Sequence, residues 1–369
     1  MFARFFSLFP FAVVALAGAT GALRGQAVGV QSITTTFTTG THSSTDTLAG
    51  SSVTFEDDQL SIVTMKDTSG NTYTVDSTVS SAVLRTDGSG TGELNQTSAW
   101  YMGSAGGGTA STLYGSYNSA NPASLLLGNN LLEGADNVFI NSSTTSAAQG
   151  NVERLDFLYN GTTGEVNNGT LAIGVFDRGT GDSFSVAVIT GVDSNGNPTS
   201  YAGFETVSNT AFTGGALLTT ASLSSTAAST ILNASSNPTD YLVRYDSSTS
   251  LATGNVTSDN TSNTQNVAGV VITLASLGIS SGTTIYGYSL MGGDVTPGTN
   301  LSTLTNWSNT SVYKTTTTDN GAFDGLDPVA VNGVLFSMHP VPEPSTYAEV
   351  FLTAAVALWG FRRRRPRLI

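Results

Sequence analysis

Short apolar runs recur through the middle of the chain, and turn-forming residues separate them. The run LDFLY at 155–159 alternates, with its apolar first, third and fifth residues on one face and Asp156 on the other. This period of two predicts a strand that is buried on one face. The run FSVAVIT at 184–190 is apolar on both faces, so we expect a central strand that is covered on both sides.

The same patterning predicts a chain built of strands. They are expected at Leu60–Met65, Thr72–Val79, Asn137–Asn141, Val152–Tyr159, Leu171–Phe176, Phe184–Thr190, Tyr201–Val207, Tyr241–Tyr245, Val267–Leu274 and Thr284–Met291. Turn-forming residues lie between them, as in Asp177–Asp182, Asn160-Gly161 and Asp193–Pro198. A strand spacing of about 8–15 residues predicts an all-β fold, an antiparallel β-sandwich or jelly roll with room for two sub-domains. One short amphipathic stretch, Leu274–Ile279, could form a helix.

Small and hydroxyl-bearing side chains dominate several segments of low complexity. These segments are Thr34–Ser44, Ala221–Thr230, Asp246–Gln265 and Lys314–Asn320. We expect exposed loops there, because such stretches bury little apolar surface. Outside a cell they could carry O-linked glycans, and plain solvated loops are the alternative.

Charge is distributed unevenly along the chain. The sequence has 13 basic and 26 acidic residues, and five of the basic ones lie in the last eight positions. Between residues 28 and 340 only six basic residues face 24 acidic ones. A body of this sign repels phosphate backbones and lacks the basic surface that nucleic-acid binding needs, so nucleic acid is excluded as a partner. Cysteine is absent, which excludes disulfides, thiolate nucleophiles and zinc–thiolate sites.

The first 27 residues have the pattern of a secretory signal peptide. Arg4 is followed by the apolar run Phe5–Leu16 and then by small residues. Ala17-Gly18-Ala19 and Gly25-Gln26-Ala27 both fit a cleavage site, and we place the end of the leader at Ala27. An ordinary buried helix is the alternative. The body is expected to span residues 28–340.

The last 29 residues, VPEPSTYAEVFLTAAVALWGFRRRRPRLI, combine an apolar run with a basic end. Val350–Phe361 has 12 residues, fewer than the roughly 20 that span a bilayer. A helix that begins after Pro344 and whose arginines reach the interface would cross with about 18 residues, with Glu349 near the outer interface. Positively charged residues that flank a membrane helix stay on the cytoplasmic side, so those at the end of this tail would stop the helix at the inner face of the membrane. They are Arg362, Arg363, Arg364 and Arg365.

These two ends together place the body outside the inner membrane. The tail alone could equally be a permanent single-pass anchor or a buried terminal helix.

Val341, Pro342, Glu343 and Pro344, followed by an apolar helix and terminal arginines, resemble the PEP-CTERM sorting signal of Gram-negative bacteria. The resemblance covers residues 341–369. It implies export through the general secretory machinery and transient anchoring in the inner membrane. It further implies recognition and cleavage near the Pro-Glu-Pro motif by an exosortase, a membrane-embedded enzyme that resembles a transpeptidase.

A second resemblance concerns the body. Leu131–Phe139, Asn151–Asp156, Leu277–Ile279 and Ile285–Leu290 look like segments of uncharacterised PEP-CTERM surface proteins. The resemblance implies an extracellular β-rich domain and brings no known activity with it.

The body offers few constellations for catalysis. The only histidines are His42, in a Thr/Ser run, and His339, near the tail, so a Ser-His-Asp triad is not supported. Acidic pairs suited to sugar hydrolysis would arise by chance among 24 carboxylates. Arg154, beside Glu153 and Asp156, is interpreted as part of a structural ion pair.

Calcium is the metal that the turns could bind. Asp193–Asn197 and the set Asp319, Asp324 and Asp327 place oxygen ligands on turns, but neither has the spacing of an EF-hand. Hydrogen bonds within an Asx turn explain Asp193 without an ion, and we favour that interpretation. No metal or cofactor is therefore predicted.

We conclude from the sequence that the chain is an exported, non-enzymatic component of the cell surface, biofilm or exopolysaccharide matrix. Its expected partners are the exosortase, the secretory machinery and exopolysaccharide. The alternatives are a secreted glycan-binding or glycan-cleaving module, for which Trp100-Tyr101 and Trp307 are the tryptophan candidates, and an adhesin stabilised by Ca²⁺.

Overall fold

The computed structural model describes the body of the chain in several stretches. The described residues are 27–40, 43–48, 51–86, 96–105, 110–115, 122–136, 138–139, 152–159, 164–179, 182–214, 239–246, 257–258, 267–313 and 325–339. The predicted signal peptide up to residue 26 and the predicted sorting tail lie outside these ranges. So do three of the segments of low complexity, apart from Asp246 and residues 257–258.

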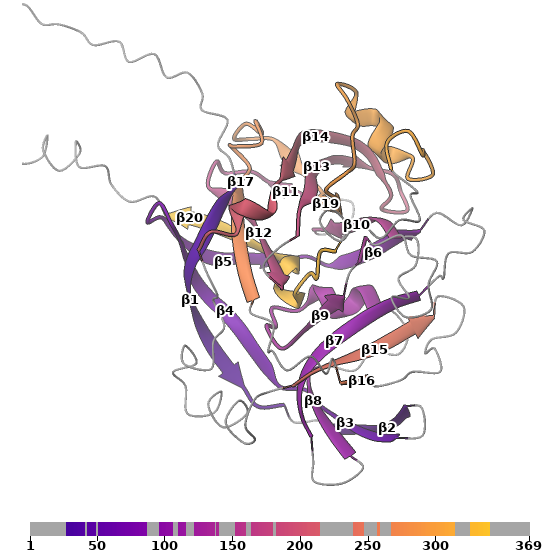
Figure 1. Ribbon diagram of the computed structural model, residues 1–369. Coiled ribbons are helices and arrows are strands. Elements are labelled where there is room, and N and C mark those ends of the chain that lie inside the picture. The colour runs from indigo at the N-terminus through magenta and orange to yellow at the C-terminus, as the bar shows by residue number, and fades with distance from the viewer. Residues whose placement is uncertain are drawn as a thin grey trace, which may run out of the picture.

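A closed barrel of strands forms one half of the fold (Figure 1). In order around the barrel its strands are β1 (Val28–Thr38), β17 (Val267–Thr273), β12 (Leu171–Arg178), β20 (Val334–His339), β5 (Thr72–Thr78) and β4 (Gln59–Asp67). The first strand closes the ring, because β1 pairs with β17 at Val28 and with β4 from Val30 onward. Met65 and Tyr73 fill the interior, whereas Thr34 and Thr36 alternate outward to solvent.

An open sheet of five strands packs against the barrel. Its order is β14 (Pro198–Val207), β13 (Phe184–Val192), β19 (Gly287–Gly292), β10 (Val152–Leu158) and β6 (Ser81–Thr86). Its inner face carries Phe157 and Val186, which share one core with Ile173 and Val270 of the barrel. Strands β12 and β17 are thus buried on both faces, which explains why their sequences are almost wholly apolar.

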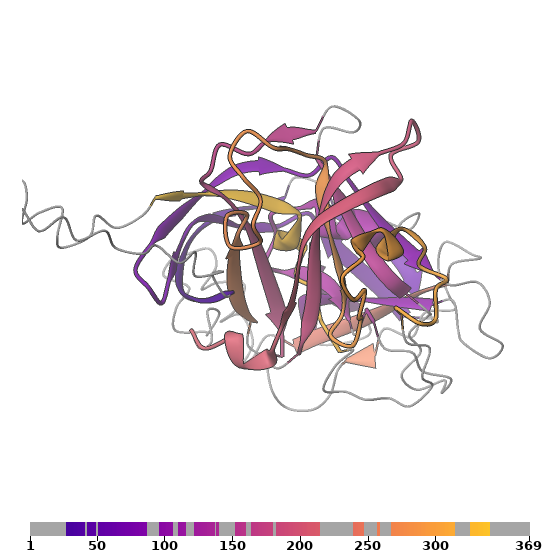
Figure 2. The same cartoon turned by 90° about the horizontal axis from the view of Figure 1, so that it is seen from above.

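The outer face of the five-stranded sheet is covered by residues 293–313. This segment includes the 3-10 helix η3 (Leu301–Thr305), and Leu304 and Tyr313 pack on Ala187 and Ile189 of β13. Figure 2 shows the orange segment beside the pink strands β13 and β14. We call residues 293–313 the cap.

A third sheet lies at one end of the barrel. Its strands are β16 (Thr257–Ser258), β15 (Thr239–Asp246), β7 (Gln96–Ala105), β8 (Ala110–Tyr114), β3 (Ser51–Glu56) and β2 (Ser43–Leu48), with β9 (Glu133–Asp136) paired to β7. Trp100 and Met102 join the core of the barrel interior. Strands β3 and β8 are parallel, whereas the other described strand pairs are antiparallel. A small pair, β11 (Glu165–Val166) and β18 (Thr284–Ile285), completes the fold.

Gly203 marks an irregularity in the hairpin of β13 and β14. The register shifts between Ala187 and Val188, and Gly203 is the residue of β14 that it leaves unpaired. Its φ of 59° lies in the left-handed region, and a Cβ added there would lie 2.5 Å from the carbonyl oxygen of Leu277. Glycine is therefore required both by the backbone and by its neighbour.

The prediction of an all-β, antiparallel fold is confirmed. The arrangement is a closed barrel packed against an open sheet, which sequence patterning did not predict. The prediction for residues 184–190 is confirmed in detail, because Phe184 and Val188 face the barrel while Ala187 and Ile189 face the cap. The alternation predicted for residues 155–159 is confirmed as well, but burial on one face only was wrong, because the cap also covers the face that carries Asp156.

Other local predictions were wrong. Residues 138–139, within the strand predicted at Asn137–Asn141, form a turn whose Val138 N–H donates to the carbonyl of Leu326. Leu274–Ile279 forms hydrogen-bonded turns instead of a helix, and ends at a glycine with φ of 77°. Residues 34–38, assigned to a loop, belong to β1, because their hydroxyl side chains occupy the solvent face of the barrel.

Helices are few and short in the described part of the chain. They are η1 (Pro122–Leu127), η2 (Asn209–Ala211), η3 and η4 (Ala330–Gly333), all of the 3-10 type. With three to six residues each, none of these described helices has the length that crossing a bilayer requires. The predicted leader and tail helices lie outside the described residues.

Candidate functional site

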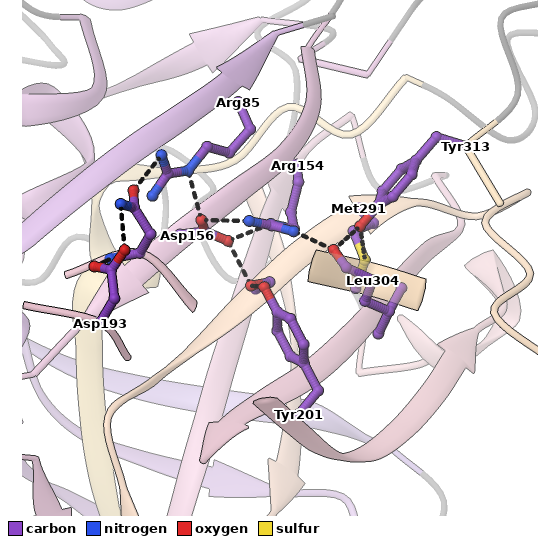
Figure 3. A network of polar contacts seen from close by, with 10 residues as sticks. Arg85, Arg154, Asp156, Asp193, Tyr201, Met291, Leu304 and Tyr313 are labelled. Atoms are coloured by element: carbon purple, nitrogen blue, oxygen red, sulfur yellow. Dashed lines mark hydrogen bonds and ion pairs between the residues drawn. The ribbon is translucent and has the colours of Figure 1, made fainter. Parts of the chain in front are cut away.

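Asp156 is the centre of a buried polar cluster beneath the cap (Figure 3). Arg154 and Asp156 are two residues apart on β10, so both side chains point to the outer face of the sheet. Arg154 Nε donates to Asp156 Oδ1 at 2.6 Å, and Nη2 donates to Oδ2 at 3.0 Å. Both side chains are fully buried. The predicted structural ion pair of Arg154 is therefore confirmed, with Asp156 as the partner.

Two neighbouring strands supply the other donors to this carboxylate. Arg85 Nε of β6 donates to Asp156 Oδ2 at 2.8 Å, and Ser289 Oγ of β19 donates to Oδ1 at 2.6 Å. Register explains both contacts, because Asp156 lies opposite Ser289 on one side and Arg154 lies opposite Arg85 on the other. We call Arg85, Arg154, Asp156 and Ser289 the Asp156 network. Each oxygen of Asp156 accepts two hydrogen bonds, so the carboxylate is fully occupied as an acceptor.

Arg154 also holds the cap onto the sheet. Its guanidinium carbon lies 5.5 Å from the ring centroid of Tyr201 and 5.2 Å from that of Trp307. Its Nη1 donates to the carbonyl oxygen of Leu304 in η3, which also accepts the Tyr313 hydroxyl at 2.9 Å. Burial lowers the pKa of Arg154, but the charge and hydrogen bonds of Asp156, together with Tyr201 and Tyr313, more than offset it, so the net pKa is raised. The guanidinium therefore stays charged at every physiological pH.

The network continues to the turn between β13 and β14. Arg85 Nη1 donates to Asn197 Oδ1 at 3.0 Å, and Asn197 Nδ2 donates to Asp193 Oδ2 at 3.0 Å. Asp193 Oδ1 accepts the backbone N–H groups of Asn195 and Asn197, both at 2.8 Å. These bonds, led by the one from the Asn197 side chain, lower the pKa of Asp193. The predicted Asx turn is confirmed.

Calcium ligation finds no support in this turn. Both carboxylate oxygens of Asp193 accept hydrogen bonds from the turn itself. Within the described ranges, no group of three or more acidic or histidine residues is arranged to hold a metal ion. Asp319 and Asp324 lie outside the described residues, and Asp327 forms an ion pair, as described below.

The solvent-facing side of the network consists of Arg85 and Trp307. The Arg85 side chain is 12% exposed, and its guanidinium carbon lies 5.1 Å from the centroid of Trp307, which is itself partly exposed. Arg85 Nη2 has no hydrogen-bond partner within the described part of the chain. This edge of the network is where a ligand could reach it.

A second buried arginine lies where the barrel meets the third sheet. Arg178 of β12 contacts Asp136 through Nη2 at 3.3 Å and Asp327 through Nε at 3.8 Å. Its guanidinium carbon lies 5.1 Å from the ring centroid of Trp100. The turn predicted at Asp177–Asp182 was wrong at its start, because Asp177 and Arg178 are buried residues of β12.

The other sequence candidates are dispersed. His339 is exposed at the end of β20, where its Nε2 hydrogen bonds with Thr74 Oγ1 at 3.0 Å, and His42 lies outside the described residues. Trp100 and Tyr101 are fully buried, so neither offers a face to a sugar. The structure does not bring these residues together.

The sorting residues lie beyond the described part of the chain, and only the end of the leader falls within it. Val341, Pro342, Glu343 and Pro344, and likewise Arg362, Arg363, Arg364 and Arg365, lie outside the described residues. Ala27 is described: it is 8% exposed, and its N–H donates to Glu205 Oε1 at 3.2 Å.

Sequence patterning did not predict Arg85, Ser289 or Arg178 as members of a cluster, and it named Trp307 only as a candidate for glycan binding. The one signal was their rarity, since these two arginines and Arg154 are three of only six basic residues in the body. No protein-family model, curated protein or solved structure matches this chain. Its function is therefore argued from its own residues.

Proposed function

We propose that this chain is an exported, non-enzymatic protein of the cell surface or extracellular matrix, sorted by an exosortase that cleaves its tail. The observation that carries the proposal is the tail sequence, in which Pro342-Glu343-Pro344 precedes an apolar run and Arg362–Arg365. A leader at one end and cytoplasmic arginines at the other direct the body across the inner membrane.

The body supports a structural role. One of its fully buried carboxylates, Asp156, accepts hydrogen bonds from three neighbouring side chains that hold strands and cap together. Its acidic composition suits an exposed surface, and its net charge repels other polyanions except where a local cation contacts them. Exopolysaccharide is the partner expected at its final location.

The test is intact-mass analysis of the protein from its host, with and without the exosortase gene. We expect the mature protein to lose the residues that follow the Pro-Glu-Pro motif, and the tail to persist in the deletion strain. Pro342→Ala with Pro344→Ala should block the loss, whereas Ser345→Ala, next to the motif, should not. An identical tail in both strains would overturn the proposal.

Glycan binding is a second candidate, favoured by one observation. Trp307 is partly exposed, and its ring centroid lies 5.1 Å from the guanidinium carbon of Arg85, whose Nη2 has no hydrogen-bond partner among the described residues. An aromatic face next to a free guanidinium donor suits a sugar that carries a carboxylate or sulfate.

Titration of the protein with polyuronate and with a neutral glucan would test this second candidate. We expect Trp307 fluorescence to respond to the polyuronate alone, and the response to disappear in Arg85→Gln. The buried Trp100 supplies a constant background, and the body without its tail lacks the third tryptophan, Trp359. No change in fluorescence with either polymer would reject this candidate function.

A further inference from the structure

Ala27 is an integral part of the folded body. Its side chain is 8% exposed and belongs to the core between the barrel and the five-stranded sheet. The residues that follow it enter the barrel at once, since Val28 pairs with Val271 and Gly29 with Val270. Ala27 thus packs as a core residue although the sequence assigns it to the end of a leader.

The segment 211–214 holds this entry in place. A Cβ added to Gly29 would lie 2.8 Å from Thr213 Oγ1, and a Cβ added to Gly214 would overlap the carbonyl oxygen of Val30. The two backbones therefore approach as closely as glycine allows. These close contacts fix the start of β1 against the segment 211–214.

Glu205 gives Ala27 a polar partner as well. The carboxyl of Glu205 on β14 accepts the Ala27 N–H at 3.2 Å, and no second donor to it is found among the described residues. Burial raises the pKa of Glu205, while the hydrogen bond from Ala27 lowers it. Removal of Ala27 would leave this half-buried carboxyl without its donor, which costs free energy.

We propose that the leader is cut upstream of Ala27, between Ala19 and Thr20, so that the mature chain keeps Ala27. The inference rests on the proposed function, because it requires export. In the cleavage, water adds across the Ala19–Thr20 amide: the hydroxyl goes to the Ala19 carbonyl carbon and the proton to the Thr20 nitrogen. Cleavage after Ala27 would instead delete a core residue and place an ammonium group at the first paired residue of β1.

The sequence is consistent with the upstream site. Ala17-Gly18-Ala19 follows the apolar run Phe5–Leu16 directly and has alanine at both key positions. Gly25-Gln26-Ala27 lies farther from the apolar run, beyond Arg24.

N-terminal sequencing and intact-mass analysis of the exported full-length product would test the assignment. We expect the mature chain to begin at Thr20, eight residues longer than a chain that begins at Val28. A mature chain that begins at Val28 would overturn the inference while leaving export intact. An uncut leader that begins at Met1 would overturn the proposed export itself, so the two failures are distinguishable.

A pair of variants separates the two sites in the precursor. Ala19→Gln places a large polar residue next to the proposed bond, and we expect it to accumulate uncut precursor. Gly25→Gln changes the first small residue of the downstream site, the counterpart of Ala17, and spares Ala27, and we expect normal processing. The reverse pattern would contradict the assignment.

Discussion

Replacement of Asp156 by asparagine should be among the most destabilising single changes of side-chain polarity in the body. Asparagine keeps the shape of the side chain but replaces one carboxylate oxygen by an NH₂ group. That group is itself a donor, so it cannot accept the two hydrogen bonds that the oxygen accepted. The charge that neutralises Arg154, a fully buried guanidinium, is lost at the same time. Arg85, which is 12% exposed, loses the same partner but can be partly hydrated.

The expected magnitude follows from the bonds that are lost. Asp156 accepts two hydrogen bonds on each oxygen, so asparagine loses two, and hydrogen bonds to charged groups contribute about 1.5–3 kcal/mol each. Removal of one partner of a buried ion pair costs about 3–5 kcal/mol, which agrees with that range. We therefore expect Asp156→Asn to lower the free energy of unfolding by about 3–5 kcal/mol.

Urea denaturation followed by tryptophan fluorescence would measure this loss. With a denaturant slope of about 3 kcal/mol/M, the midpoint should fall by about 1–1.7 M. Ser289→Ala, which removes one of the four hydrogen bonds to the carboxylate and leaves its charge in place, should cost about 1.5–3 kcal/mol. The double variant Arg154→Met with Asp156→Leu should cost less than Asp156→Asn alone, because apolar residues leave no buried charge. A loss under about 1 kcal/mol for Asp156→Asn, or a double variant that loses more than Asp156→Asn, would refute the reasoning.

Three further changes test other features. Burial raises the pKa of Asp182 from 3.8 to about 6. The stability that its protonated form contributes is therefore fully present below about pH 4 and is lost as the pH rises through 6. Asp182→Asn should raise the melting temperature at pH 7 but not at pH 4. Gly203→Ala should lower the free energy of unfolding by about 1–3 kcal/mol, because the φ of this residue is positive and an added Cβ would meet Leu277. An unchanged melting temperature would contradict the bulge geometry. Trp307→Leu should cost about 1–2 kcal/mol by loosening the cap from Arg154, measured as faster proteolysis within residues 293–313.

Sequence patterning succeeded where one short segment carries the whole signal. Residues 184–190 are apolar on both faces and are covered on both faces, and Asp193 closes its turn with donors two and four residues away. It failed where the partner is distant. Residues 34–38 look like a loop because their threonines face solvent, and only pairing with β4 makes them a strand.

The two arginine clusters were beyond prediction for the same reason. Trp307 follows Arg154 by more than 150 positions, and nothing near either residue in the sequence indicates that their side chains stack. Arg178 was assigned to a turn from its glycine-rich neighbours, although its partners Asp136 and Asp327 lie on distant segments. Long-range register, set by the assembled sheets, determines both clusters.

The position of β20 in the barrel constrains when the protein can fold. This last strand, Val334–His339, is inserted between β12 and β5, and the ring is closed by pairing of β1 with β17, whose partners Val28 and Val271 are far apart in sequence. Such a high contact order makes folding slow, because a long loop must close before its contacts contribute. The barrel cannot be completed until residue 339 has been synthesised. A chain that is threaded through a secretion pore from its N-terminus would therefore stay open for nearly its whole length, and would complete its barrel only as the start of its tail arrives.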